Sequence, residues 1–382
     1  MKMATQKTLA LGIGLIFVLA LSSRSQAGSL IAWGSGLGTN CPSGITNVVA
    51  IASGSGHGLA LLADGAVAGW GDNSYSQTNF PGVLTNAVAV AAGYYHSLAL
   101  RSDGTVAAWG RNTYFQTTTP TGLSNVVAIA GGENHSLALK GDGGAVNWGV
   151  YSDGTAGFFT NALPATMTNI VAIASGNNHD LMLRGDGTLI AWGLNNYGQT
   201  NVPPGTTNVM LIAAGGDDCL ALTRDGRLIA WGRNNWFQTN VPAGLTNVTG
   251  MAAGTDHNLG LKNQGTVTAW GSNAAGQTNV PVTASNVIGI AAGKDYSLAL
   301  IGAGPASPGA TAPAAMRPVF SQGVFSVPVA TARGRGYGLE FKDSLSESNW
   351  RMLVPRPGDG ATNMLSDPRA TGSKRFYRVR KW

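Results

Sequence analysis

The stretch Val88-Ala-Val-Ala-Ala-Gly-Tyr-Tyr-His-Ser-Leu-Ala-Leu100, followed by a Trp-Gly pair at Trp109, decides the fold. Its pattern occurs seven times, ending at Leu61, Leu100, Leu139, Leu183, Leu222, Leu261 and Leu300. The Trp-Gly pair also occurs seven times, at Trp33, Trp70, Trp109, Trp148, Trp192, Trp231 and Trp270, with a usual spacing of 39 residues. Self-similarity at such a period indicates a repeat architecture.

Each repeat predicts the same short β elements. An apolar strand, a tight turn and a His-Ser-Leu-Ala-Leu strand lead through an Asp-Gly dipeptide to a third strand that ends at Trp-Gly. Asp-Gly between apolar runs is a strong hairpin signal. The connection that follows, Asn-x-x-x-Gln-Thr-Asn-Val-Pro, is either a loop or a fourth edge strand. A single unit cannot bury its apolar faces, so the units must stack, as the blades of a propeller do.

The two ends of the repeat region are complementary. The chain opens with a Trp-Gly strand, 30–34, that lacks partner strands, and 287–300 supplies two strands that lack a Trp-Gly strand. Pairing them completes one blade and leaves no free sheet edge. We therefore predict an all-β protein: a seven-bladed β-propeller closed by pairing of the N- and C-terminal half-blades, followed by a small β domain.

These repeats resemble the regulator-of-chromosome-condensation repeat superfamily. The 39-residue period and the Gly-Gln-Thr-Asn-Val-Pro connections at 198–203 and 276–281 are especially similar to the secreted, seven-bladed β-lactamase inhibitor protein II. The resemblance covers about residues 29–301. It implies the propeller fold, and it implies that aromatic-rich loops on one face grip a partner protein.

Composition agrees with this fold class. Glycine accounts for 55 of the 382 residues, charged residues for 11% and hydrophobic residues for 44%. Abundant glycine and little charge favour many short strands and tight turns, and exclude a helical bundle, a coiled coil and a collagen-like chain.

The N-terminus is typical of an export signal. Lys2 and Lys7 precede an uncharged, mostly apolar run over 9–21, and Ser25-Gln26-Ala27 offers a cleavage site. The run is shorter than a membrane-spanning helix requires. We predict a signal peptide at 1–27, a propeller at 28–301, a Gly/Ala/Pro-rich linker at 302–318 and a small β domain at 319–382. The protein is thus expected to be exported to the extracellular space, the cell surface or the periplasm.

The distribution of charge argues against a nucleic-acid partner, and the positions of the two cysteines argue against a disulfide. Residues 28–304 carry a net charge of −4 and residues 305–382 a net charge of +7, so the basic overall balance does not belong to the propeller. We predict no nucleic-acid partner, no membrane span after signal cleavage and a monomer. Cys41 and Cys219 fall in distant repeats and are expected to be buried and unpaired.

The histidines raise the question of a metal site. All five occupy one repeat position, His57, His96, His135, His179 and His257, where the other two repeats have Asp218 and Tyr296. Zinc needs three or four ligands meeting at one point, which sevenfold-related positions do not readily provide. We interpret these residues as side chains that satisfy backbone groups, and the repeated tryptophans as core. No catalytic motif is present, and we predict no catalytic residue, no metal and no cofactor.

Chain parity selects one face of the propeller. The turn before His-Ser-Leu-Ala-Leu and the connection after Trp-Gly must lie at the same end, and this end collects the non-repeating aromatic residues. The predicted partner-binding residues are Tyr75, Tyr94, Tyr95, Tyr114, Phe115, Tyr151, Phe158, Phe159, Tyr197, Trp236 and Phe237. Arg111, Arg233 and Asp72 adjoin them, and the one irregular repeat inserts five residues within 150–159. Variable loops on a rigid scaffold commonly carry function, although about half of these rings could pack between loops.

The tail contains a second pattern. Alternating runs at 324–329, 337–341, 350–354 and 375–379 predict four or five strands, and the segment resembles a terminal module common on exported proteins of Verrucomicrobia-type bacteria.

Our leading hypothesis is a non-enzymatic, exported binding module that presents its aromatic loops to a protein or extracellular polymer. The rivals are a structural envelope or matrix component and a propeller enzyme acting on polysaccharide.

Overall fold

The computed structural model describes residues 29–80, 82, 84, 86–152, 158–159, 163–164 and 167–302, and backbone strands within 319–381. The predicted signal peptide lies outside these residues, as does the predicted linker apart from Gly302. Within the described part of the chain, no helix is both long enough and apolar enough to cross a membrane.

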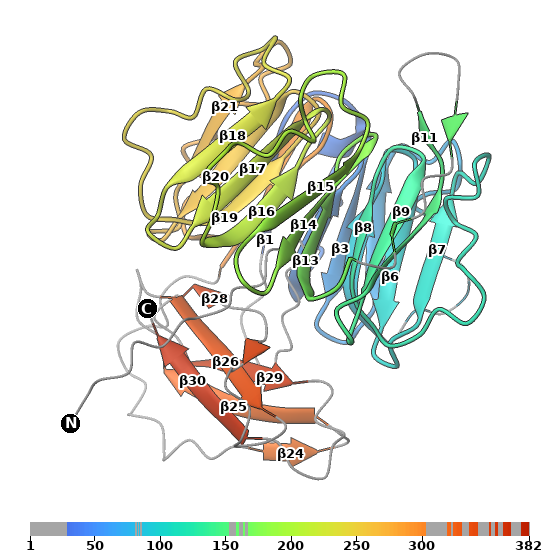
Figure 1. Cartoon of the computed structure of the whole chain (residues 1–382), viewed down its shortest axis with the longest axis vertical. Helices are drawn as coiled ribbons and strands as arrows, with labels where there is room; N and C mark the ends of the chain where they lie inside the picture. Colours follow the sequence, from blue (N-terminus) through green and yellow to red (C-terminus); the bar gives the residue numbers. More distant parts are fainter. Residues whose placement is uncertain are drawn as a thin grey trace.

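The repeats form seven three-stranded antiparallel sheets among the described residues, arranged as the blades of a β-propeller (Figure 1). The inner strands are β2 (Val48–Ser53), β5 (Ala87–Ala92), β8 (Val126–Gly131), β13 (Ile170–Ser175), β16 (Val209–Ala214), β19 (Val248–Ala253) and β22 (Val287–Ala292). The middle strands are β3 (His57–Leu62), β6 (His96–Arg101), β9 (His135–Lys140), β14 (His179–Arg184), β17 (Asp218–Thr223), β20 (His257–Lys262) and β23 (Tyr296–Ile301).

The outer strands end at the Trp-Gly pairs. They are β1 (Ser29–Gly34), β4 (Val67–Gly71), β7 (Val106–Gly110), β10 (Ala145–Gly149), β15 (Leu189–Gly193), β18 (Leu228–Gly232) and β21 (Val267–Gly271). The connections that follow are turns in the described residues, so the alternative of a fourth edge strand in every repeat is wrong. Beyond these strands, the region has a 3-10 turn, η1 (Leu37–Thr39), and a small hairpin of β11 (Tyr151–Ser152) and β12 (Phe158–Phe159).

The propeller closes as expected from its complementary ends. Strand β1 pairs with β23 in antiparallel register, from Ser29 opposite Ile301 to Gly34 opposite Tyr296. The indole N–H of Trp33 also donates to the Gln277 carbonyl at 2.8 Å. The inner strands contact one another in sequence, and β22 returns to β2. The first strand of the chain thus completes the last sheet.

The core lies between neighbouring sheets. Each of the seven apolar clusters draws buried residues from two adjacent sheets, and one of them, around Ile51 and Leu298, packs the closing sheet against the sheet that contains β2. Six Trp-Gly tryptophans are buried, as predicted for core residues. Most of them donate their indole N–H to the carbonyl of a glutamine in the preceding connection, as Trp109 does to Gln77 at 2.8 Å. Trp192 is half-buried and its Nε1 has no partner in the described residues.

The cysteines are unpaired, as predicted. Cys219 is fully buried, whereas Cys41 is only partly buried, which corrects the expectation for that residue. Burial raises the pKa of the Cys41 thiol to about 11, so it is not a reactive thiolate at neutral pH.

The tail forms two further sheets (Figure 1). One has the order β24 (Val319–Ser321), β25 (Val324–Ala330), β29 (Thr362–Asp367), and in the other β26 (Gly336–Lys342) pairs with β27 (Arg351–Met352), β28 (Arg356–Pro357) and β30 (Phe376–Lys381). Four or five strands were expected, whereas the described residues of the tail form seven, of which three are only two or three residues long.

Candidate functional site: the aromatic loop face

The turns before the middle strands and the connections after the outer strands are hydrogen-bonded to each other. The backbone N–H of Arg111 donates to the Tyr95 carbonyl, and that of Arg233 donates to the Asp217 carbonyl, both at 2.9 Å. Both kinds of loop therefore lie at one end of the propeller, as chain parity predicts. We call this end the loop face.

Each regular connection on the loop face is held in one shape by its own side chains. In the loop after β4, Gln77 Oε1 accepts the Tyr75 N–H at 2.8 Å and Asn73 Oδ1 accepts the Thr78 N–H at 3.0 Å. The same two bonds recur in the loops after β7 and β18. They impose a left-handed backbone on the residue before the glutamine.

The residue at that left-handed position differs from loop to loop. Glycine occupies it at Gly198 and Gly276, with φ of 77° and 78°, but phenylalanine occupies it at Phe115 and Phe237, with φ of 63° and 62°. A non-glycine residue pays about 1–2 kcal/mol for this conformation. Both rings are nevertheless 66% and 70% exposed, so no packing in the described structure compensates for the strain.

Other predicted aromatic residues surround an arginine. The Arg111 guanidinium lies over the rings of Tyr75, Tyr95 and Tyr114 at 5.3, 5.7 and 5.1 Å from their centroids. Tyr95 also contacts Tyr94 edge-on at 4.8 Å, and burial raises the pKa of the Tyr95 hydroxyl. We call these five residues the Arg111 cluster.

An equivalent group lies three repeats further along the chain. The Arg233 guanidinium lies over the Tyr197 ring at 5.3 Å, and it also lies 3.6 Å from carboxylate oxygens of Asp217 and Asp256. Burial raises the pKa of both carboxyl groups, outweighing the attraction of the arginine. We call these four residues the Arg233 cluster.

Exposure divides the predicted binding residues. Tyr75, Phe115, Tyr197, Trp236 and Phe237 are exposed, whereas Tyr94, Tyr95 and Tyr114 are half-buried within the Arg111 cluster. Only the backbone of Phe158 and Phe159 is described, in β12. Exposure makes the five rings available to a partner; their binding role stays a prediction.

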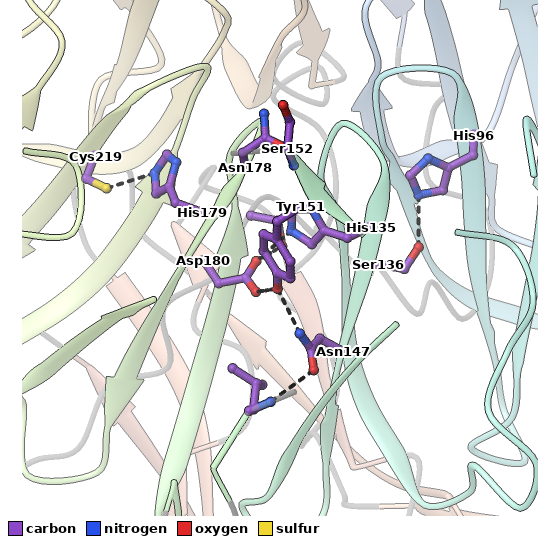
Figure 2. A network of polar contacts seen from close by, with 12 residues as sticks. His96, His135, Ser136, Asn147, Tyr151, Ser152, Asn178, His179, Asp180 and Cys219 are labelled. Atoms are coloured by element: carbon purple, nitrogen blue, oxygen red, sulfur yellow. Dashed lines mark hydrogen bonds and ion pairs between the residues drawn. The ribbon is translucent and has the colours of Figure 1, made fainter. Parts of the chain in front are cut away.

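Tyr151 corrects the sequence reading, because its side chain is only 1% exposed and cannot meet a partner. It stacks on His135, with ring centroids 4.1 Å apart, and its hydroxyl donates to Asp180 (Figure 2). Asn147 Nδ2 in turn donates to the Tyr151 hydroxyl at 2.9 Å. The irregular repeat therefore folds its first aromatic residue inward, between the sheets that contain β9 and β14.

Asp180 was not singled out from the sequence. It follows the repeated histidine, where three other repeats have serine, and it accepts hydrogen bonds from His135, Tyr151 and Ser175. Burial alone raises the pKa of this carboxyl, but the neighbouring His135 and these donors bring it below its usual value. The signal that could have found it is an acidic residue beside the only lengthened repeat. The group is buried on all sides, so no substrate reaches it.

The repeated histidines do not form a metal site. Each histidine instead bonds to a side chain of the neighbouring sheet. Nε2 of His57 lies 3.0 Å from Ser97 Oγ, and Nε2 of His96 lies 2.9 Å from Ser136 Oγ (Figure 2 shows the latter). The serines donate to glutamine carbonyls, so the histidine N–H is the donor to the serine. The partner is thus a side chain of the next sheet, not a backbone group as expected. No group of three or more metal-ligating side chains occurs among the described residues.

The axial channel offers little chemistry. Its volume is about 130 Å³, and its wall consists mostly of alanine, glycine and serine from the inner strands and the turns that follow them. The larger side chains of the wall are Tyr94, Asn177, Met251, Thr255 and Lys294. This lining contains no carboxylate pair of the kind a glycosidase needs.

A family model and solved structures agree with this description. The regulator of chromosome condensation (RCC1) repeat model matches residues 48–77, 87–116, 170–199, 211–235 and 248–277. The chain contains RCC1 repeats. The matched segments leave out the sheet of β8, β9 and β10 with its irregular connection, which contains Tyr151, and they also leave out the closing sheet of β22, β23 and β1. No curated protein matches the chain significantly.

Among solved structures, the chain is similar to Prp20p of Saccharomyces cerevisiae, with 21% identity, coverage of 75% of this chain and 94% of that one, and a TM-score of 0.62. That protein is described through its binding to Gsp1p and histones. Human WBSCR16 gives 23% identity, 66% and 87% coverage and a TM-score of 0.54. The ectodomain of the Physcomitrella patens receptor kinase CR4 gives 24% identity, coverage of 64% of this chain and 67% of that one, and a TM-score of 0.53. The TM-scores show that these proteins share the β-propeller fold, and at identities this low the similarity shows the fold alone.

Proposed function

We propose that this protein is a non-enzymatic, exported binding module that holds a protein partner on its loop face. The observation that carries the proposal is the pair Phe115 and Phe237, two exposed rings on left-handed backbone. Residues on strained backbone cluster at functional sites, and exposed aromatic rings at such positions are suited to contact a partner. The predicted signal peptide supports export, and the binding described for Prp20p supports a binding role for the fold.

Surrounding side chains support a protein partner over a polysaccharide. Tyrosine, tryptophan and arginine dominate the energies of protein interfaces. Tyr75 of the Arg111 cluster, Tyr197 of the Arg233 cluster and Trp236 are all exposed on the loop face. Phenylalanine has no polar group for sugar hydroxyls, but its ring fits an apolar pocket of a protein surface.

The test is a pull-down from the native extracellular fraction, comparing the mature protein with the double variant Phe115→Gly and Phe237→Gly. Glycine suits the left-handed backbone, so we expect the variant to gain about 1–2 kcal/mol in unfolding free energy while losing the partner. Loss of binding then cannot be ascribed to unfolding.

The matched control is Ser76→Gly, at the same loop position and also left-handed, with φ of 62°. It relieves one strained position instead of two, so it should gain about half as much stability, and it should keep the partner. Equal recovery of partners by the double variant would refute the loop-face proposal.

A further inference from the structure

The two arginine clusters are copies of one design that differ in charge. Tyr75, Arg111, Tyr114 and Phe115 correspond, three repeats on, to Tyr197, Arg233, Trp236 and Phe237. In both copies the arginine lies over the aromatic ring of the preceding connection, at 5.3 Å from its centroid. The backbone hydrogen bond that positions the arginine is also the same. The two sites can therefore be compared residue by residue.

The residues that neutralise Arg233 are replaced around Arg111. Asp217, in the turn of its own sheet, corresponds to Tyr95, and Asp256, in the turn of the next sheet, corresponds to Asn134. Among the described residues, no acidic side chain forms an ion pair with Arg111. Within the described part of the chain, its Nε–H makes only a long side-chain hydrogen bond, 3.5 Å to Thr113 Oγ1.

An arginine that stacks its guanidinium on aromatic rings can still donate its N–H groups to an acceptor that lies in the plane of the guanidinium. Three tyrosine rings hold the Arg111 guanidinium, so little side-chain freedom remains to be lost when it meets an anion. Nearby, the exposed Phe115 ring provides apolar contact area. A carboxylate beside an apolar side chain matches both features.

We infer that the Arg111 cluster is the charged anchor of the loop face, and that it takes a glutamate or aspartate flanked by an apolar or aromatic residue of the protein partner. The Arg233 cluster satisfies its own arginine and contributes aromatic contacts only. This inference rests on the proposed function, and it adds the chemistry of the partner segment.

The test uses a fluorescently labelled random copolymer of glutamate and tyrosine as the probe, with a lysine–tyrosine copolymer as its charge-reversed counterpart. We expect the full chain to bind the glutamate copolymer, with an affinity that falls as salt rises. Arg111→Gln should weaken this binding about tenfold, and Arg111→Lys should weaken it less. Arg233→Gln, the matched control, should change it less than twofold.

A second variant places beside Arg111 a carboxylate like the one that neutralises Arg233. Tyr95→Asp supplies the residue that Asp217 provides in the other copy, so it should also weaken binding of the glutamate copolymer about tenfold. Thermal unfolding of each variant checks that the fold is retained. If Tyr95→Asp unfolds, the comparison of Arg111→Gln with Arg233→Gln decides alone.

Three results would overturn the inference: no binding of the glutamate copolymer by the unaltered chain, equal binding of the lysine copolymer, or unchanged binding by Arg111→Gln. The proposed function fails separately. If Phe115→Gly with Phe237→Gly loses the native partner while Arg111→Gln binds every probe normally, the loop face binds, but Arg111 is not its anchor.

Discussion

Two contacts between neighbouring sheets occupy the same place in the propeller but use opposite chemistry. At the regular contact, neutral His57 donates to Ser97, which in turn donates to the Gln77 carbonyl. At the contact between β17 and β20, Asp218 instead accepts one hydrogen bond from Asn258, and its other oxygen, Oδ1, has no partner in the described residues. The repeat frame therefore tolerates different polar pairs, and it is the pH dependence of stability that should distinguish them.

The largest expected effect concerns the regular contacts. Burial lowers the pKa of His57, His179 and His257 to about 4 and that of His96 to about 3. Because the unfolded chain takes up these protons near pH 6.5, stability is full above that value and is lost as the pH falls toward 4. Each histidine should cost up to about 3 kcal/mol. Chemical denaturation between pH 7 and pH 4 measures this loss, and a flat profile would contradict it.

The contact between β9 and β14, where Asp180 takes the place of the usual serine, should be the most sensitive to a single substitution. Asp180→Ala leaves His135, Tyr151 and Ser175 without their shared acceptor inside the core. Breaking a buried pair in this way costs about 3–5 kcal/mol, which the unfolding free energy measures. Ser136→Ala, at the equivalent position of the preceding sheet, is the control and should cost clearly less. Equal losses would mean that Asp180 acts as an ordinary member of the repeat.

Asp218 should respond to pH in the direction opposite to the histidines. Burial raises its pKa to about 7, so the native state holds a proton that the unfolded state releases near pH 4. Its contribution to stability is therefore full below pH 4 and is lost as the pH rises through 7. Asp218→Asn should add about 2–4 kcal/mol at pH 8 and almost nothing at pH 4. The same gain at both pH values would contradict a titrating Asp218.

Asp218→His sharpens the same comparison, because it restores the residue of the regular repeats. The Oδ1 atom of Asn258 is buried without a partner and could accept the new imidazole N–H. We expect this variant to lose the alkaline decline of Asp218 and to acquire the acid sensitivity of the regular histidines. Denaturation profiles over the full pH range read both changes.

The smallest expected effect compares two tryptophans. Trp109 donates its indole N–H to Gln77, whereas the Nε1 atom of Trp192 has no partner among the described residues. Trp109→Phe should therefore cost about 1 kcal/mol more than Trp192→Phe, the net worth of one hydrogen bond. Thermal unfolding of the two variants checks the difference, and a reversed order would refute it.

Sequence periodicity predicts the propeller because each repeat carries its own strand, turn and hairpin signals. The closure of β1 on β23 follows from two incomplete units, and the loop face follows from counting chain reversals. These inferences use only local patterns and their order, which the structure preserves.

Contacts between repeats are harder to predict. Each histidine bonds to the second residue of the middle strand in the next sheet, as His57 does to Ser97, a relation that spacing alone does not give. Tyr151 was misassigned because an insertion at the loop face was expected to point outward, whereas Asp180 gives its hydroxyl an acceptor inside. The difference between the Arg111 and Arg233 clusters likewise depends on which turns lie side by side in space.

The pairing of β1 with β23 has a consequence for how the protein is made. The chain has to keep its first strand, Ser29–Gly34, unpaired until residues as late as Ile301 have left the ribosome. A pairing across so long a stretch of chain is expected to form slowly. The propeller can therefore close only after the whole repeat region has been synthesised, and a truncated chain would expose an unpaired sheet edge.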